Sequence, residues 1–369
     1  MKVPMLDLRG QYASLRAEME PAVLALMESQ QFVLGEPVAR LERALAAYSG
    51  CRFAVGVSSG TDALLCSLMA LGVGYGDEVI VPTFTFFGSA GVIARTGAKP
   101  VFVDIEPAGF NLDVEQAARA VSRRTKALMP VHLFGQMARM EAVSELAREV
   151  RLGGAVVEDA CQSVGARRGG KGPGQWGTCA CLSFYPSKNL SAFGDGGMIL
   201  CQDEALAQRC RHLRMHGEDT RYHHSMIGGN FRLDAWQAVV LEIKLRHLDG
   251  WVARRRAHAA LYDQILEGVV QTPAILPGNE SVYNQYVIRA AGRDELQRFL
   301  ADKGIGTAIY YPVPLHLQKC FAYLGGRAGD CPVAEQACRE VLALPVYPEL
   351  TEEEIRYVAE CLREFYQGK

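Results

Sequence analysis

We expect the rest of the chain to be arranged around the segment Ser183-Phe-Tyr-Pro-Ser-Lys188, which continues as Asn-Leu-Ser-Ala-Phe-Gly-Asp-Gly to Gly197. It places a lysine in a turn between two apolar runs, with serines before it and glycines after it. A lysine held in a dry pocket loses its proton more easily, becomes nucleophilic and can form a Schiff base with an aldehyde. The segment therefore indicates that Lys188 is reactive; the alternative is an ordinary surface lysine in a turn.

Strand-like and helical segments alternate on the N-terminal side of this stretch. Apolar runs predict strands at Phe53–Val57, Glu78–Val81, Pro100–Asp104, Lys126–Val131 and Ala155–Glu158. Helical spacing lies between them, at Asp62–Leu71, Gly88–Arg95, Val114–Val121 and Met140–Val150. Two further strands bracket the lysine, at Cys179–Tyr185 and Gly197–Cys201. Such alternation predicts crossover helices and a mostly parallel sheet, in which ligands gather at the carboxyl ends of the strands.

The remaining segments predict an N-terminal helical pair and a smaller second domain. Helices are expected at Gln11–Gln31, Glu36–Tyr48 and Glu204–Met215, and one long amphipathic helix from Arg232 to Leu266. We expect the domain change near Trp251, between a large domain (1–250) and a small mixed α/β domain (251–369). Its expected elements are strands at Tyr286–Arg289 and Thr307–Tyr310, and helices at Glu295–Lys303, Val333–Val341 and Glu352–Phe365. Arg254–Arg256 are expected on an exposed helix face.

Composition argues against several classes of function. Among 369 residues, 39 basic and 41 acidic side chains leave a net charge of -2, which gives no reason to expect nucleic acid or an anionic membrane as a partner. The eleven cysteines lack zinc-site or disulfide spacing, which predicts reduced core thiols in a cytoplasmic protein. We expect neither a signal peptide nor a membrane span, because no apolar run reaches about 18 residues. His132 and the pair His223-His224 lack a second pair at ligand spacing, so no metal is expected.

The turn from Val57 to Asp62, Val-Ser-Ser-Gly-Thr-Asp, follows a strand and opens a helix. Its free backbone N–H groups, its hydroxyls and the helix dipole would together form a cradle for an anion such as phosphate. The alternative is that serine, threonine and aspartate only cap the helix.

Glu158 and Asp159 end a valine-rich strand, where we expect their side chains to point into the ligand crevice. A buried carboxylate needs a cationic partner, and the protonated nitrogen of a pyridine ring is such a partner. Gln162 would then donate a hydrogen bond to a phenolic oxygen on the same ring. The alternative is a helix-capping acid and a surface amide.

Phe84 and Phe86 lie just past the Val79–Pro82 strand, where either ring could cover one face of a flat cofactor or belong to the core. Taken jointly, a phosphate cradle, a strand-end acid with a nearby amide, and Lys188 occur in this order on a parallel sheet. These are the parts that an enzyme dependent on pyridoxal phosphate requires, so the sequence predicts that cofactor.

Ordered motifs along essentially the whole chain resemble the DegT family of nucleotide-sugar aminotransferases, which are pyridoxal phosphate enzymes of fold type I. They include SSGTDAL (58–64), VEDACQS (157–163), SFYPSKNL (183–190), GGNFRLD (228–234) and YYPVPLHLQ (310–318). The resemblance implies an aspartate-aminotransferase-like α/β fold: a three-layer domain with a mostly parallel sheet, and a small C-terminal α/β domain. The chain departs from the family pattern at Cys161, where alanine is common, at Ser191, where glycine is usual, and at Tyr310, where histidine is frequent.

The resemblance also implies a role for each residue around the cofactor. Lys188 bonds covalently to the cofactor and then moves a proton between two carbons. Asp159 faces the pyridine nitrogen, Gln162 the ring oxygen and Phe86 a face of the ring. The residues expected at the phosphate are Gly60, Thr61 and Ser183, with Asn230 reaching it from the partner subunit of a homodimer with shared active sites. The positions expected at the sugar nucleotide are Arg232, Tyr310 and Tyr311.

The activity implied by the resemblance has two half-reactions, in which an amino acid, L-glutamate by resemblance, supplies nitrogen and a nucleotide-linked ketosugar accepts it. The motifs look most like those of relatives that aminate C3, and amination at C4 is the alternative. Such products enter surface polysaccharides or glycosides. A related sugar dehydratase has histidine in place of the lysine, so Lys188 argues against it. A regulatory role in transcription has little support from a near-neutral chain without a helix-turn-helix segment.

Overall fold

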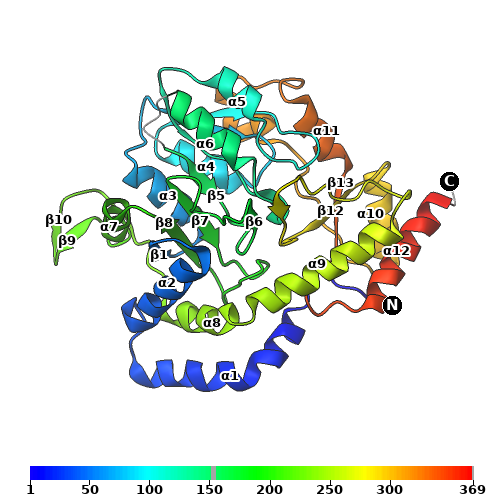
Figure 1. The fold of residues 1–369 in the computed structure, drawn as a ribbon, viewed down its shortest axis with the longest axis horizontal. Coiled ribbons are helices and arrows are strands. Elements are labelled where there is room, and N and C mark those ends of the chain that lie inside the picture. Colours follow the sequence, from blue (N-terminus) through cyan, green and yellow to red (C-terminus); the bar gives the residue numbers. More distant parts are fainter. Residues whose placement is uncertain (151–154, 368–369) are drawn as a thin grey trace.

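Figure 1 shows the fold as a computed structural model, which describes residues 1–150 and 155–367. Its central layer joins a sheet of order β3-β2-β4 to a sheet of order β5-β7-β8-β1 through parallel bridges between Leu128 and Val156 and between Val131 and Asp159. The strands are β1 (Phe53–Val57), β2 (Glu78–Pro82), β3 (Lys99–Val103), β4 (Thr125–Leu128), β5 (Val157–Asp159), β7 (Cys179–Ser183) and β8 (Gly197–Cys201). β8 runs antiparallel to β7 and β1, whereas β2, β3, β4, β5 and β7 pair in parallel. The predicted mostly parallel sheet is therefore confirmed.

Helices cover both faces of this layer, as the α/β prediction required. One face packs against α2 (Gly35–Ser49), α5 (Val114–Ala120), α6 (Met140–Glu149) and α8 (Ala235–Leu245). The other packs against α3 (Gly60–Ala70), α4 (Phe87–Arg95) and α7 (Glu204–Leu213). Successive strand side chains alternate between these cores, so Ala54 lies in the first and Val55 in the second. The three layers are thereby held by two separate apolar interfaces.

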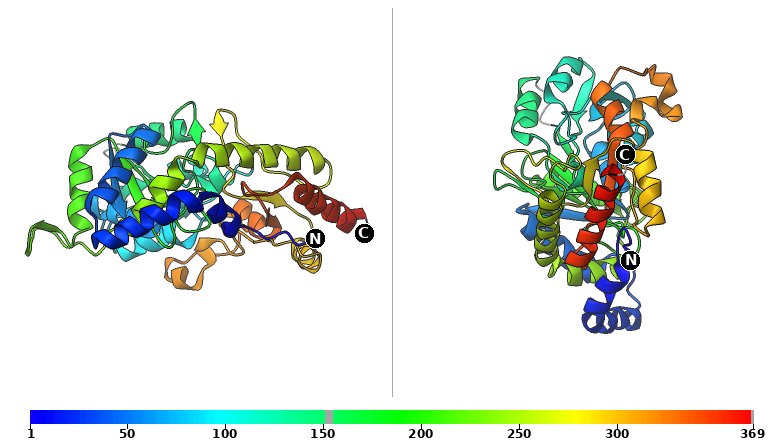
Figure 2. Two further views of the ribbon diagram at one scale, coloured as in Figure 1. Left: turned by 90° about the horizontal axis from the view of Figure 1, so that it is seen from below. Right: turned by 90° about the vertical axis from the view of Figure 1, so that its right-hand side faces the viewer.

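The C-terminal elements form a further core beside the sheet. It is built from α9 (Leu248–Ile265), β12 (Tyr286–Arg289), α10 (Arg293–Asp302), β13 (Val341–Leu344) and α12 (Glu352–Gln367), and it includes Val3 near the N-terminus. α11 (Pro332–Glu340) packs on a neighbouring cluster, and α1 (Leu8–Ser29) lies along α8. The two termini lie at the same end of the molecule (Figure 2). The domain change expected near Trp251 stays a prediction.

Short elements complete the described chain. They are β6 (Arg167–Arg168), β9 (Glu218–Thr220), β10 (His223–His224), β11 (Asn279–Glu280) and the 3-10 turns Leu133–Gly135, Leu315–Leu317 and Lys319–Leu324. In the described part of the chain, no helix combines the length and apolar character that a membrane crossing needs. All eleven cysteines are free thiols and most are buried, as the prediction of reduced core thiols required.

Three local predictions were wrong. The long helix predicted from Arg232 to Leu266 is two helices, because α8 packs on the sheet while the later part of α9 serves the C-terminal core. The strand predicted at Thr307–Tyr310 is reduced to one bridge, between Ala308 and Ala343, because the chain then turns toward the pocket described below.

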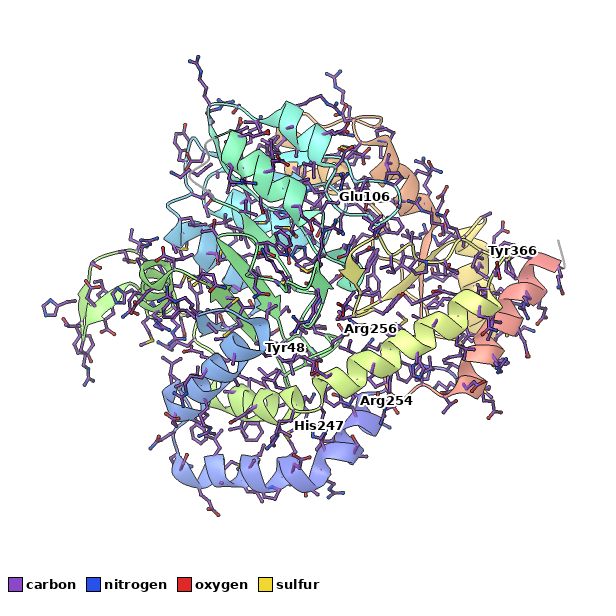
Figure 3. All side chains as sticks on the ribbon, viewed as in Figure 1. Tyr48, Glu106, His247, Arg254, Arg256 and Tyr366 are labelled. Atoms are coloured by element: carbon purple, nitrogen blue, oxygen red, sulfur yellow. The ribbon has the colours of Figure 1, made fainter. Side chains whose placement is uncertain are left out.

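The third error concerns the arginine triplet. Arg254 and Arg256 lie on α9 (Figure 3), and Arg254 is exposed as predicted. Arg255, however, is buried, and its guanidinium donates hydrogen bonds to the carbonyl oxygens of Tyr283 and Val346 at 3.2 and 2.6 Å. It therefore ties α9 to two C-terminal loops instead of facing solvent.

Candidate active site

A cavity of about 500 Å³ opens where several parallel strands end. Its wall includes the residues that follow β1, β2 and β7 and the last residue of β5, which is the edge at which ligands of such sheets bind. Nine of the residues predicted from the sequence line it: Gly60, Thr61, Phe86, Asp159, Gln162, Ser183, Lys188, Tyr310 and Tyr311. The structure thus brings segments more than two hundred residues apart into one site.

The N-terminus of α3 forms one wall of the cavity. Ser59 caps the helix, since its hydroxyl oxygen accepts a hydrogen bond from the Asp62 amide at 3.0 Å and its carbonyl accepts one from the Ala63 amide. The amides of Gly60 and Thr61 lie in the first turn, where no acceptor exists within the helix. A Cβ on residue 60 would lie 2.6 Å from the Ser183 side chain, so only glycine fits there. Ser59 therefore caps the helix, as the alternative interpretation held. The amides of Gly60 and Thr61 have no acceptor among the described residues, so the predicted anion cradle stays a prediction that this geometry permits.

Lys188 projects into the same cavity from the turn after β7, where its amide donates a hydrogen bond to the Tyr185 carbonyl at 2.8 Å. Burial lowers the pKa of its amine below the ordinary value of 10.5, while Cys161 and Asp159 act in the opposite direction. In the described part of the chain, no ion pair engages this amine. The amine is therefore neutral more often than that of an exposed lysine, as a nucleophile or proton acceptor requires.

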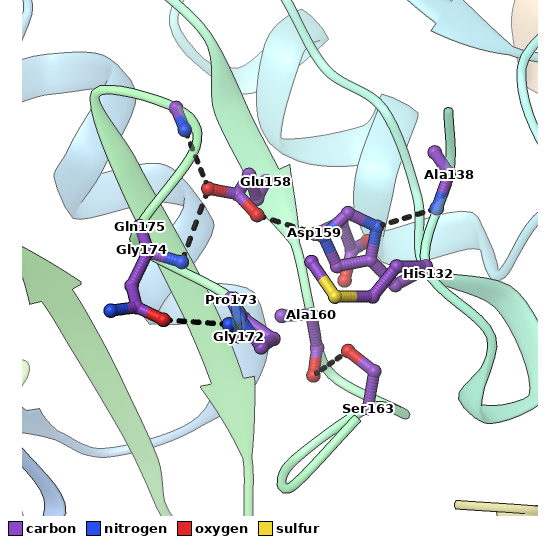
Figure 4. Close-up of polar contacts among 12 residues, drawn as sticks. His132, Ala138, Glu158, Asp159, Ala160, Ser163, Gly172, Pro173, Gly174 and Gln175 are labelled. Atoms are coloured by element: carbon purple, nitrogen blue, oxygen red, sulfur yellow. Dashed lines mark hydrogen bonds and ion pairs between the residues drawn. The ribbon is translucent and has the colours of Figure 1, made fainter. Parts of the chain in front are cut away.

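Figure 4 shows the hydrogen bonds of Glu158, which precedes Asp159 at the end of β5. Asp159 faces the cavity and accepts hydrogen bonds from the Ser89 hydroxyl at 2.6 Å and the Cys161 amide at 3.2 Å. Glu158 points to the opposite side of the strand, because successive side chains alternate. Of the two acids predicted to face the crevice, only Asp159 does so.

Glu158 is instead satisfied within the protein. One carboxylate oxygen accepts hydrogen bonds from the amides of Gly174 and Gly177 at 3.1 and 2.7 Å. The other lies 2.8 Å from His132 Nε2. Because the Ala138 amide donates to His132 Nδ1, the Nε2 atom carries the hydrogen and donates a hydrogen bond to Glu158. His132 is thus a structural residue, and both side chains are fully buried.

Aromatic and amide groups form another part of the cavity wall. Phe86 is largely exposed and lines the cavity, whereas Phe84 is buried in a core cluster, so the structure separates the two candidates for a stacking ring. Gln162 accepts a hydrogen bond from the Phe134 amide at 2.6 Å and donates one to the Tyr311 hydroxyl at 3.2 Å. Burial raises the pKa of Tyr311, so this hydroxyl keeps its proton.

Two predicted residues lie outside the cavity of their own chain. Asn230 is exposed and bridges to Met215, and Arg232 bridges to Val57. Conversely, sequence reasoning gave no site role to Ser89, Asp195 or Gln285, which the structure places at Asp159 or in the cavity wall. Ser89 lies in the first turn of the helix after β2. Because ligands gather at the carboxyl ends of parallel strands, this position could have been suggested from the sequence.

The cavity fits pyridoxal phosphate by the chemistry of its groups. The free amides of Gly60 and Thr61 suit the phosphate, the Asp159 carboxylate suits a protonated ring nitrogen, and the Lys188 amine suits the aldehyde. Phe86 offers a flat surface for the ring.

Comparison with known proteins identifies the class. The model of the DegT/DnrJ/EryC1/StrS aminotransferase family matches residues 13–363. A pleiotropic regulatory protein of Geobacillus stearothermophilus is 51% identical, with 100% of this chain and 99% of that protein covered. A UDP-N-acetyl-3-dehydro-α-D-glucosamine 3-aminotransferase of Acidithiobacillus ferrooxidans is 42% identical over 99% of this chain and 98% of its own. The solved structure of S. venezuelae DesV, in complex with a ketimine intermediate, superimposes with a TM-score of 0.96 at 42% identity, covering 99% of this chain and 98% of that one.

The chain therefore belongs to the DegT/DnrJ/EryC1/StrS aminotransferase family. It is a sugar aminotransferase that depends on pyridoxal phosphate, as the sequence predicted.

Proposed function

We propose that this enzyme transfers the amino group of L-glutamate to C3 of a nucleotide-linked ketosugar, in the synthesis of amino sugars for a surface polysaccharide or glycoside. The observation that carries the proposal is that Lys188 and Asp159 face one cavity beside the free amides of α3. The regiochemistry is supported by the names of relatives such as the Acidithiobacillus 3-aminotransferase. Free thiols throughout the chain support a cytoplasmic location.

Each residue then has a defined task. Bound pyridoxal phosphate supplies an aldehyde carbon that receives the amino group and a ring that delocalises the electron pair left when a C–H bond breaks. Lys188, whose pKa is lowered by burial, would take the proton from one carbon and return it to another. Asp159 keeps a proton on the ring nitrogen, and the Ser89 hydroxyl fixes the direction of its carboxylate. Gly60 and Thr61 hold the phosphate, and Phe86 shields the ring from water.

The proposal includes a homodimer in which each subunit completes the other's site. Lys188 is the one cationic side chain lining the described cavity. The cofactor phosphate, the glutamate carboxylates and a nucleotide diphosphate together need more positive charge than one reacting amine provides. Arg232, outside its own chain's cavity, is available for this task, with Asn230 as a neutral donor. Tyr185, close to Lys188, exposes 55% of its surface, which suits burial by a second copy.

Complementation tests the shared site. Lys188→Ala and Arg232→Ala subunits should each be inactive as pure proteins, and mixing them should restore part of the activity, since one of the two sites in a mixed dimer is then intact. Absence of any restoration in mixed dimers, verified by mass spectrometry, would show that each site belongs to one chain.

The activity itself is tested with glutamate and a panel of 3-keto and 4-keto nucleotide sugars. Glutamate alone should change the absorption spectrum of the bound cofactor, and NMR of the product should locate the new amine at C3. An amine at C4 would establish the alternative regiochemistry. A reaction that removes a hydroxyl without gain of nitrogen would identify a dehydratase.

A regulatory role is the second candidate, because the Geobacillus relative at 51% identity carries that name. The cofactor-binding groups that line one cavity favour the enzyme. Failure of the purified protein to bind pyridoxal phosphate, together with specific binding to DNA, would reverse this preference.

A further inference from the structure

Gln285 lies at the boundary between the cavity and the C-terminal core. It immediately precedes β12, and its backbone amide donates a hydrogen bond to the Phe134 carbonyl. The next residue, Tyr286, is fully buried in the C-terminal core and stacks on Tyr262 with ring centroids 4.9 Å apart. Because neighbouring side chains of an extended segment point in opposite directions, Gln285 is turned toward the cavity, where it forms part of the wall.

The side chain of Gln285 is almost enclosed, but its hydrogen bonding is incomplete. Only 8% of the residue is exposed, and Oε1 is buried without a hydrogen-bond partner in the described part of the chain. Gln162, the other amide in this wall, has both ends engaged, by the Phe134 amide and the Tyr311 hydroxyl. An unpaired buried acceptor is unfavourable, so an acceptor beside a cavity calls for a donor from a ligand or a water molecule.

The two substrates differ in the donors they bring. Glutamate carries one donor group, the ammonium that reacts, and its carboxylates are acceptors. A nucleotide-linked ketosugar carries ring hydroxyls and, in N-acetylated sugars, an amide N–H, all of which are donors. An acceptor in the cavity wall therefore suits the sugar.

We propose that Gln285 is a specificity-determining residue of the sugar half-reaction, whose Oε1 accepts a hydrogen bond from a hydroxyl or acetamido N–H of the ketosugar. This inference rests on the proposed function and adds a residue to its sugar site. It predicts that Gln285 discriminates between the two half-reactions, which share every residue that holds the cofactor.

A competing partner for Oε1 is a water molecule. Gln285 also borders a second, small pocket of about 20 Å³, together with Gln136 and Ser281. That volume is enough for about one water molecule. If such a water satisfied Oε1, the side chain would be a spacer between the small pocket and the cavity, and its loss would affect both half-reactions alike.

The experiment replaces Gln285 with methionine, which has similar length and no hydrogen-bonding amide. Stopped-flow absorbance follows the cofactor with glutamate and, from the aminated form, with UDP-N-acetyl-3-dehydro-α-D-glucosamine or whichever ketosugar of the panel the wild type uses best. We expect kcat/KM of Gln285→Met to fall about 10- to 100-fold with the ketosugar and to change less than about threefold with glutamate. Calorimetry with the unreactive UDP-N-acetylglucosamine should show Kd raised about tenfold.

Asn284→Leu is the matched control. Asn284 is also buried, and neither its Nδ2 nor its Oδ1 has a hydrogen-bond partner among the described residues. It does not line the cavity, so its variant should show no difference between the half-reactions. Equal losses in both half-reactions of Gln285→Met, or no loss in either, would overturn the assignment. Failure of the wild type to aminate any ketosugar, despite reaction with glutamate, would overturn the proposed function and this assignment with it.

Discussion

Replacing Lys244 with methionine should stabilise the protein at neutral pH. Lys244 lies on α8 with only 2% of its surface exposed, and its amine donates one hydrogen bond, to the Ser191 hydroxyl at 2.9 Å. The amine also lies 4.8 Å from the centre of the Phe193 ring. In the described part of the chain, no carboxylate forms an ion pair with it. A buried ammonium with so few partners is expensive to keep charged.

The pKa gives the size of this penalty. Burial lowers the pKa of Lys244 from 10.5 to about 8, partly offset by Glu349. Because the unfolded chain binds the proton more tightly, the penalty is complete below pH 8 and disappears as the pH rises toward 10.5. It amounts to about 3 kcal/mol, since a tenfold change in proton affinity is ~1.4 kcal/mol. Loss of the hydrogen bond to Ser191 offsets about 1 kcal/mol, which leaves a net gain of about 2 kcal/mol for Lys244→Met at pH 7.

Urea unfolding at fixed protein concentration, between pH 7 and pH 10, measures the effect. Lys244→Met should unfold at higher urea than the wild type at pH 7, and the difference should shrink steadily toward pH 10. The exposed Lys126 provides the control, because Lys126→Met should change stability little at any pH. A variant less stable than the wild type at pH 7, or a difference independent of pH, would refute the claim that Lys244 is a costly buried cation.

Other substitutions separate the residues of the site from those of the fold. Lys188→Ala should abolish transamination and leave the circular dichroism spectrum unchanged; appreciable residual turnover would contradict its role. Asp159→Ala should weaken cofactor retention and catalysis together, whereas Glu158→Gln should mainly lower the urea midpoint, because Glu158 has only protein partners. Phe84→Ala should cost about 3–5 kcal/mol of stability. Phe86→Ala should instead speed loss of the cofactor in dialysis, and the reverse pattern would show that the two rings are wrongly assigned.

The sheet was predictable because its strands are short apolar runs separated by clear turn residues. The observed strands β1, β8 and β12 have the predicted bounds, and β2 differs by one residue. The break between α8 and α9 was not predictable, because the amphipathic pattern continues across residues 246–247 while the core that it faces changes. β13 escaped detection because it follows α11 directly, without a turn that would signal a new strand.

Within the site, a residue could be predicted where a motif or its place near the end of a strand marked it in the sequence. Asp159 ends β5 and Lys188 lies in the turn after β7, so both motif and topology point to the same edge of the sheet. Whether Glu158 or Asp159 faces the cavity depends on which side of the strand each side chain occupies. That side becomes certain only when His132, the partner of the buried Glu158, is known. Gln285 could not be found, because its segment resembles any chain leading into a buried strand until the fold places it beside the cavity.

The two acids of β5 are also linked mechanically. Glu158 is held from three directions, by the amides of Gly174 and Gly177 and by the His132 ring, on the face away from the cavity. A strand anchored in this way cannot rotate or slip by one residue without breaking those bonds, and a slip of one residue would turn Asp159 away from the cavity. The buried Glu158 therefore fixes the direction in which Asp159 points.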